Sequence, residues 1–93
     1  MQNVRQAAKY TNLSASAAVK STSGVVYGFV VNSHTSGTLK LWDNTAGSGT
    51  VLLNTITFAA GSGIVVALPV GIQFGVGLYA TIGGTADITI IWE

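Results

Sequence analysis

Cysteine is absent from this chain of 93 residues, and charged side chains are scarce. Without thiols the protein can form neither a disulfide nor a thiolate-bound metal site. Asp, Glu, Lys and Arg supply only 8% of the residues, against roughly 25% in an ordinary soluble domain. Charged side chains normally cover the surface of a free monomer. A surface with so few charges therefore predicts contact with other copies of the chain.

The charge balance and the apolar runs exclude further classes of function. A formal net charge of +1 supplies no long-range field that would attract nucleic acid or a membrane surface. The longest apolar stretch, 64–80, is interrupted by Pro69, Gln73 and three glycines, unlike a membrane-spanning helix. No apolar segment follows the first five residues, so no secretory leader is expected. We expect neither nucleic acid nor a membrane among the partners.

Strand and turn chemistry is what the chain has in abundance. Glycine, serine and threonine make up a third of the residues, and β-branched and aromatic runs alternate with them after Ser23. About six to eight short strands, roughly 8–14 residues apart and without a helical period, predict an all-β fold. The expected architecture is a small antiparallel β-sandwich, jelly-roll-like.

Turn residues set the expected boundaries of these strands. Asn, Ser and Gly in 32–37 favour a turn there, and Gly83–Gly84 is predicted as a second, tight turn. Pro69 is predicted to end a strand, because proline cannot donate to a central ladder. The expected strands are 25–31, 38–42, 50–58, 64–68, 71–74, 77–82 and 86–92.

Alternation within two of these strands predicts which face is buried. In the strand over 38–42, Leu39 and Leu41 lie on one face. Lys40 and Trp42 lie on the other. The last strand also places an apolar set on a single face: Ile88, Ile90 and Trp92.

The first twenty residues differ from the rest, since they hold three of the four basic residues, Arg5, Lys9 and Lys20. Terminal segments of this kind are ordered only where something ties them down. We expect residues 1–20 to form an N-terminal arm that includes a possible first strand. Residues 21–93 are expected to form the β-sandwich domain.

Groups suited to catalysis are few: one histidine and three carboxylates, Asp43, Asp87 and Glu93. A triad would need His34, Asp43 and a nearby serine to converge, but no serine stands in a nucleophile elbow. A paired-carboxylate site would require Asp43 and Asp87 to meet from separate loops. We therefore expect no catalytic residue and no enzymatic activity, and a turn histidine that is exposed or bonded to backbone.

The sequence gives no better support for a metal or cofactor site than for a catalytic one. Asp43 and Asn44 could join a weak calcium site, but the acidic spacing of an EF-hand is absent. The expected role of Asp43 is a turn that bonds its own backbone. The glycines of 75–80 loosely match a dinucleotide pattern, yet the residues after them are strand-like rather than helical. We expect neither a metal nor a cofactor.

The aromatic residues leave one binding alternative open. Four of them could act as stacking platforms in a carbohydrate site: Tyr27, Trp42, Tyr79 and Trp92. Core or inter-subunit packing is the more ordinary role of such side chains. Nucleic acid would need basic residues interleaved with aromatics, and only Lys40 beside Trp42 fits that pattern.

Two motifs carry a resemblance to a known group of proteins. Residues 31–45 have the sequence VNSHTSGTLKLWDNT, and residues 77–87 have the sequence GLYATIGGTAD. Through these motifs, residues 24–93 resemble small β-rich virion proteins of tailed bacteriophages, of the capsid decoration or cement type. Residues 1–20 lie outside the resemblance.

The resemblance implies a structural protein that acts as a homotrimer and binds the major capsid protein. Its location would be the capsid surface of the virion, after assembly in the host cytoplasm. Candidate contacts with the capsid or a partner subunit are Arg5, Lys9, Lys20, Lys40 and Trp42. The alternative is a carbohydrate- or receptor-binding β-sandwich module of a phage head or tail appendage.

Overall fold

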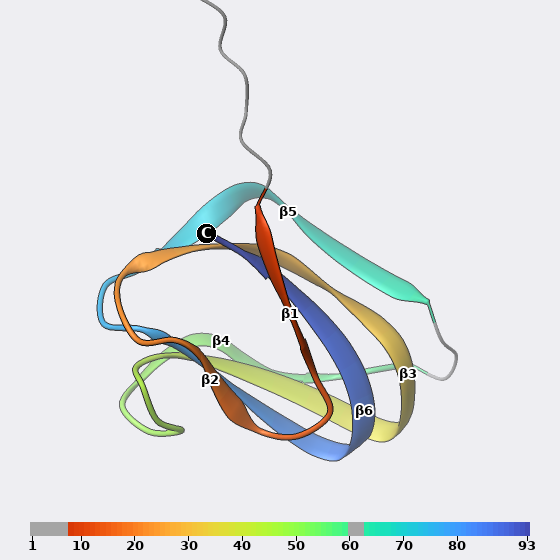
Figure 1. Ribbon diagram of the computed structural model, residues 1–93. Coiled ribbons are helices and arrows are strands. Elements are labelled where there is room, and N and C mark those ends of the chain that lie inside the picture. Colours follow the sequence, from red (N-terminus) through yellow and green to blue (C-terminus); the bar gives the residue numbers. More distant parts are fainter. Residues whose placement is uncertain (1–7, 60–62) are drawn as a thin grey trace, which may run out of the picture.

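The computed structural model describes residues 8–59 and 63–93, which form six strands and no helix. None of these residues belongs to a helix that could cross a membrane. All strand pairs are antiparallel, so the prediction of a small antiparallel β-sandwich is confirmed. The strands are β1 (Lys9–Leu13), β2 (Ala17–Lys20), β3 (Gly24–Asp43), β4 (Thr50–Thr57), β5 (Ile64–Phe74) and β6 (Leu78–Trp92) (Figure 1).

Two long strands organise the sandwich. β3 and β6 pair along most of their length, from Val26 opposite Trp92 to Trp42 opposite Tyr79. The first half of β3 also pairs with β5 and its second half with β4, while β6 pairs with β2 near its start and β1 near its end. One sheet is thus folded into two layers. We call them the β1 layer (β1, the end of β6, the start of β3, and β5) and the β2 layer (β2, the start of β6, the end of β3, and β4).

Two segments predicted as turns lie inside the long strands instead. Residues 32–37 belong to β3 and Gly83–Gly84 to β6, and they face each other where both strands cross between the layers. Register shifts here, with positive φ at Ser36 (50°) and Gly84 (66°), mark bulges that bend both strands. A side chain at Gly84 would collide with the carbonyl of Ser36, so glycine serves a bend rather than a tight turn.

The prediction that a strand ends at Pro69 is also wrong. β5 continues through Pro69 as far as Phe74. It pairs with β3 alone, and its register shifts between the pairs Val26–Ile72 and Gly28–Ala67. Proline is accommodated in an edge strand at such a shift, because no bond of a central ladder is lost there.

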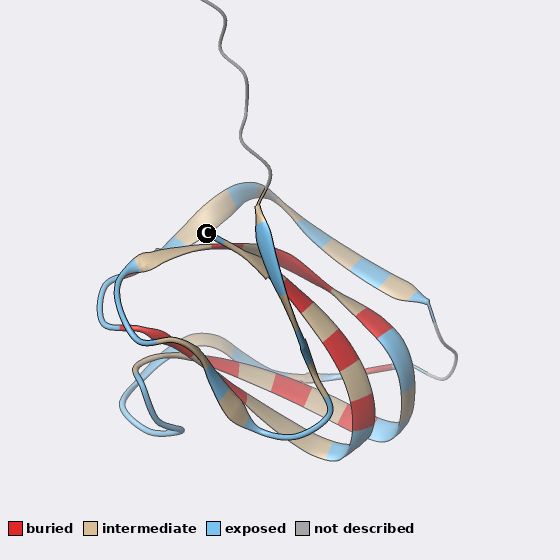
Figure 2. Cartoon of the chain, in the orientation of Figure 1, coloured by how far each residue is buried: buried red, intermediate tan, exposed pale blue. Residues whose placement is uncertain are grey.

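The core lies between the two layers and follows the predicted alternation (Figure 2). Leu39 and Leu41 are fully buried, whereas Lys40 and Trp42 are half-buried on the opposite face. The buried apolar side chains come from both layers and from the segment after β4: Val26, Phe29, Val31, Leu39, Leu41, Phe58, Phe74, Leu78, Ala80, Ala86, Ile88 and Ile90.

Residues 9–20 belong to the sheet. The expected arm with one possible strand contains two, β1 and β2, and both pair with β6. Lys9 begins β1 and Lys20 ends β2, so both lysines lie at an edge of the sandwich. Arg5, the remaining candidate of this region, lies outside the described residues.

The two edges of the sandwich differ in charge. Residues 44–86 contain no Asp, Glu, Lys or Arg, and they include all of β4 and β5. We call β4 and β5 the neutral edge. The opposite strands, β1 and β2, carry Lys9 and Lys20, and we call them the basic edge.

Candidate functional site

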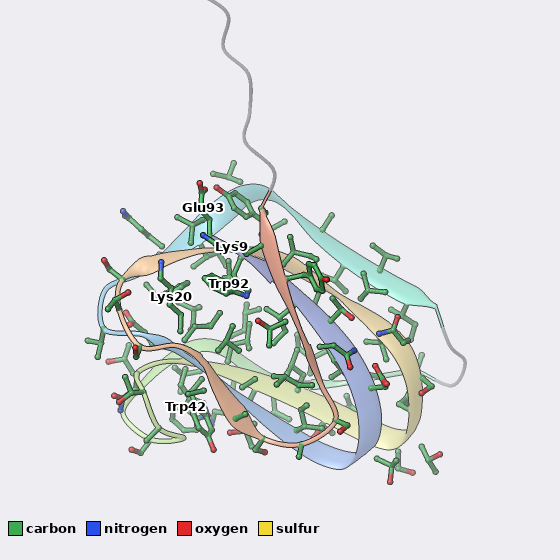
Figure 3. All side chains as sticks on the ribbon, in the orientation of Figure 1. Lys9, Lys20, Trp42, Trp92 and Glu93 are labelled. Atoms are coloured by element: carbon green, nitrogen blue, oxygen red, sulfur yellow. The ribbon has the colours of Figure 1, made fainter. Side chains whose placement is uncertain are left out.

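The predicted contact residues that the structure describes fall into two separate groups. Lys9 and Lys20 gather beside Trp92, which the sequence did not single out as a contact, while Trp42 lies elsewhere (Figure 3). Lys40 belongs with Trp42. Two of the predicted lysines therefore lie beside Trp92, and the third lies beside Trp42.

Trp92 lies on the core side of the β1 layer, in line with Ile88 and Ile90. Its indole N–H donates to the Thr11 hydroxyl at 2.8 Å. The Nζ atoms of Lys9 and Lys20 lie 5.9 and 5.5 Å from the centre of its ring, within range of a cation–π attraction. Both amines of the basic edge thus turn inward, which is one way in which edge strands are kept from pairing with other chains.

Trp42 lies on the outer face of the β2 layer. Its indole N–H donates to the Thr81 hydroxyl at 2.9 Å, and Lys40 Nζ lies 4.3 Å from the centre of its ring. Lys40 and Trp42 are two positions apart on β3, so the strand itself brings them to one face. Tyr79 is the register partner of Trp42 on β6.

The four aromatic residues considered for a carbohydrate site do not form one surface. Trp92 faces the core, and Trp42 pairs with Tyr79 on the β2 layer. Tyr27 belongs to the β1 layer, where its hydroxyl donates to Glu93 Oε1 at 2.7 Å. Lysine amines lie over both indoles, so these rings are not open stacking platforms.

His34 is bonded to backbone, as predicted. Its Nδ1 accepts the backbone N–H of Gly37 at 3.2 Å, so Nε2 is the nitrogen that donates to the Ala59 carbonyl at 2.7 Å. The ring also meets Phe58 edge-on, with centroids 5.4 Å apart. These contacts hold the crossing of β3 against the segment that follows β4.

Asp43 does not cap its own turn, contrary to expectation. Its carboxylate accepts backbone N–H groups of Gly75, Val76 and Gly77 at 2.8–3.4 Å, across the connection between β5 and β6. The amide of Gly75, then that of Val76, lowers the pKa of Asp43 below its ordinary value. Asp43 therefore joins the end of β3 to this connection.

Asp87 belongs to a polar row that was not foreseen. Its Oδ1 accepts the side-chain amides of Asn12 at 2.7 Å and Asn32 at 3.0 Å. Each amide also donates to the Thr89 hydroxyl at 3.1 Å. The bonds from Asn12 and then Asn32 lower the pKa of Asp87. The row crosses β1, β6 and β3 on the outer face of the β1 layer, and Asp43 has no part in it.

An apolar hollow of about 470 Å³ lies beside this row. The register of β3 shifts between Val26 and Gly28, so Tyr27 has no register partner, and Tyr27, Gly28 and Val30 all line the hollow. A side chain at Gly28 would collide with the carbonyl of Val66. The hollow is lined by residues of β3, β5 and β6 together with Ala8. We call this hollow the trough.

Comparison of the chain with family models, curated proteins and solved structures found no match. Among residues 8–59 and 63–93, no three His, Asp or Glu side chains gather as a set of metal ligands. Functional inference therefore rests on the edges of the sandwich, the polar row and the trough.

Proposed function

We propose that the protein is a structural subunit of a virion, a decoration or cement protein that acts as a homotrimer on the capsid surface. The observation that carries this proposal is the neutral edge. Natural edge strands are commonly protected by charges, prolines or covering segments. β4 has neither a charged residue nor a proline, so its outer backbone groups are suited to a neighbouring copy.

Exposed apolar side chains point to the same region. Among the described residues, the exposed large hydrophobics apart from Tyr10 all fall within 44–86: Val51, Val65, Val70 and Val76. Exposed apolar side chains in one part of a protein favour an interaction surface there. A second copy of this chain is a fitting partner, because a neutral surface opposes no charge on an identical neighbour.

The assignment to a capsid rests on the resemblance in residues 31–45 and 77–87. A decoration protein needs a compact body, a surface for self-association and a surface that grips the shell. Arg5 is the candidate for contact with an acidic capsid surface, because the amines of Lys9 and Lys20 lie over Trp92. Lys40 and Trp42 offer a further contact on the β2 layer.

Cryo-electron microscopy of the virion whose genome encodes this chain tests the proposal. We expect density for the sandwich on the outside of the capsid, with three copies around each occupied position. Particles grown without the gene should lack that density, which is the matched control. A chain that is absent from the particle, or located only in a tail appendage, would contradict the proposal.

A further inference from the structure

The polar row has a fixed pattern of donors and acceptors. A carboxylate only accepts, so Asn12 and Asn32 must both turn their Nδ2 atoms toward Asp87. Each Nδ2 also donates to the Thr89 hydroxyl, and that of Asn12 lies 3.4 Å from the Ile88 carbonyl as well. The carbonyl oxygens of the two amides therefore face away from the network.

Four polar groups in this row retain hydrogen-bonding capacity for a ligand. Within residues 8–59 and 63–93, Oδ1 of Asn12, Oδ1 of Asn32 and Oδ2 of Asp87 accept no hydrogen bond. The Thr89 hydroxyl accepts from both amides and so keeps its own proton to donate. Three acceptors and one donor side by side are complementary to a group of neighbouring hydroxyls.

An exposed aromatic ring borders the row. Tyr10 is 74% exposed and lies two positions before Asn12 on β1, so the two side chains share the outer face. Ile91 is its register partner, and Ile91 also lines the trough. A ligand on the polar row would thus have an aromatic and aliphatic surface beside it.

The charges around this face disfavour the binding of an anionic ligand. Asp87 stands in the row, and Glu93 accepts from Tyr27 at the border of the trough. Lys9 and Lys20 turn to the inner side, toward Trp92. The polar row and the apolar trough lie side by side, and a small-ligand site usually combines a concave apolar surface with a few polar groups.

We propose that the outer face of the β1 layer binds a neutral sugar ring of a glycan. Ring hydroxyls donate to the free oxygens of Asn12, Asp87 and Asn32, and one accepts from Thr89. The apolar C–H face of the ring packs on Tyr10 and Ile91. The proposal does not rest on the assembly proposed above, although Val65 of the neutral edge also lines the trough, and it uses none of the aromatic residues first considered for carbohydrate.

Titration of the ¹⁵N-labelled full chain with methyl glycosides of glucose, galactose, mannose and N-acetylglucosamine tests the proposal. We expect saturable shifts of the Asn12, Asn32 and Tyr10 signals with at least one of them. Tyr10→Ala should weaken that binding about tenfold, which corresponds to ~1.4 kcal/mol. Trp42→Ala, on the other layer, should leave it unchanged.

Three outcomes overturn the proposal. The first is that no glycoside shifts these signals. The second is that Tyr10→Ala and Asn32→Ala bind as well as the unaltered chain while giving its native spectrum. The third is that calcium ions or N-acetylneuraminic acid shift the same signals and the neutral glycosides do not. Because Tyr10 is so exposed, its replacement leaves the core intact, and the oligomeric mass measured in parallel reports on assembly separately.

Discussion

The basic and neutral edges of the sandwich differ in the length of their strands and in how those strands are protected. β1 and β2 carry Lys9 and Lys20, whose amines lie over Trp92. β4 and β5 lie in a stretch without any charged residue, and their protection is limited to Pro69 in β5. The scarcity of charge is therefore confined to one region of the chain. Charged side chains protect only the basic edge from pairing with another chain.

The largest effect is expected from placing charge on the neutral edge. Val51 is 41% exposed on β4, so Val51→Lys should leave the fold intact and reduce the proposed trimer to a monomer. Ala18→Lys introduces the same charge at an exposed position of β2 and is the matched control. Size-exclusion chromatography with light scattering measures both. Equal masses for the two variants would contradict the claim that the neutral edge, and not the basic edge, mediates self-association.

A smaller effect is expected from removing Trp92 of β6, the ring that the lysines of the basic edge cover. Trp92 packs against the buried core, so Trp92→Ala should lower the free energy of unfolding by about 3 kcal/mol. Trp42 lies on an outer face, and Trp42→Ala should cost about 1 kcal/mol. Urea unfolding of both variants measures the difference. A larger loss at Trp42 would contradict the placement of Trp92 in the core.

The smallest effect is expected at Asp43, the charge that precedes the neutral stretch. Its folded pKa is lowered from the ordinary 3.8 by the amides of 75–77, so ionised Asp43 stabilises the fold above that pH. Asp43→Asn should therefore lower the melting temperature at neutral pH. The difference from the unaltered chain should shrink as the pH falls below 3.8 through the lowered value. A difference that does not change with pH would contradict the role of the carboxylate.

Alternation was sufficient to predict the faces of individual strands. Leu39, Leu41, Ile88 and Ile90 are buried as expected, because side chains on a strand point to opposite faces in turn. Segments rich in glycine and serine were harder to interpret. Residues 32–37 and 83–84 have the composition of turns, yet bulges inside a long strand use the same residues. Composition alone does not distinguish a bend from a turn.

The candidate sites depend on contacts between distant parts of the chain, which no local pattern predicts. Lys40 beside Trp42 was visible in the sequence because both stand on one strand. Lys20 beside Trp92 requires the pairing of β2 and β1 with opposite ends of β6. Likewise, Asn12, Asn32 and Asp87 come together from three strands. Their signal in the sequence is limited to single polar residues within strands.

Sedimentation equilibrium of the unaltered chain at micromolar concentration tests the central claim, that the neutral edge serves self-association. We expect a mass three times the 9.5 kDa of one chain, and a mass of 9.5 kDa for Val51→Lys. A mass of 9.5 kDa for the unaltered chain over the whole concentration range would contradict it.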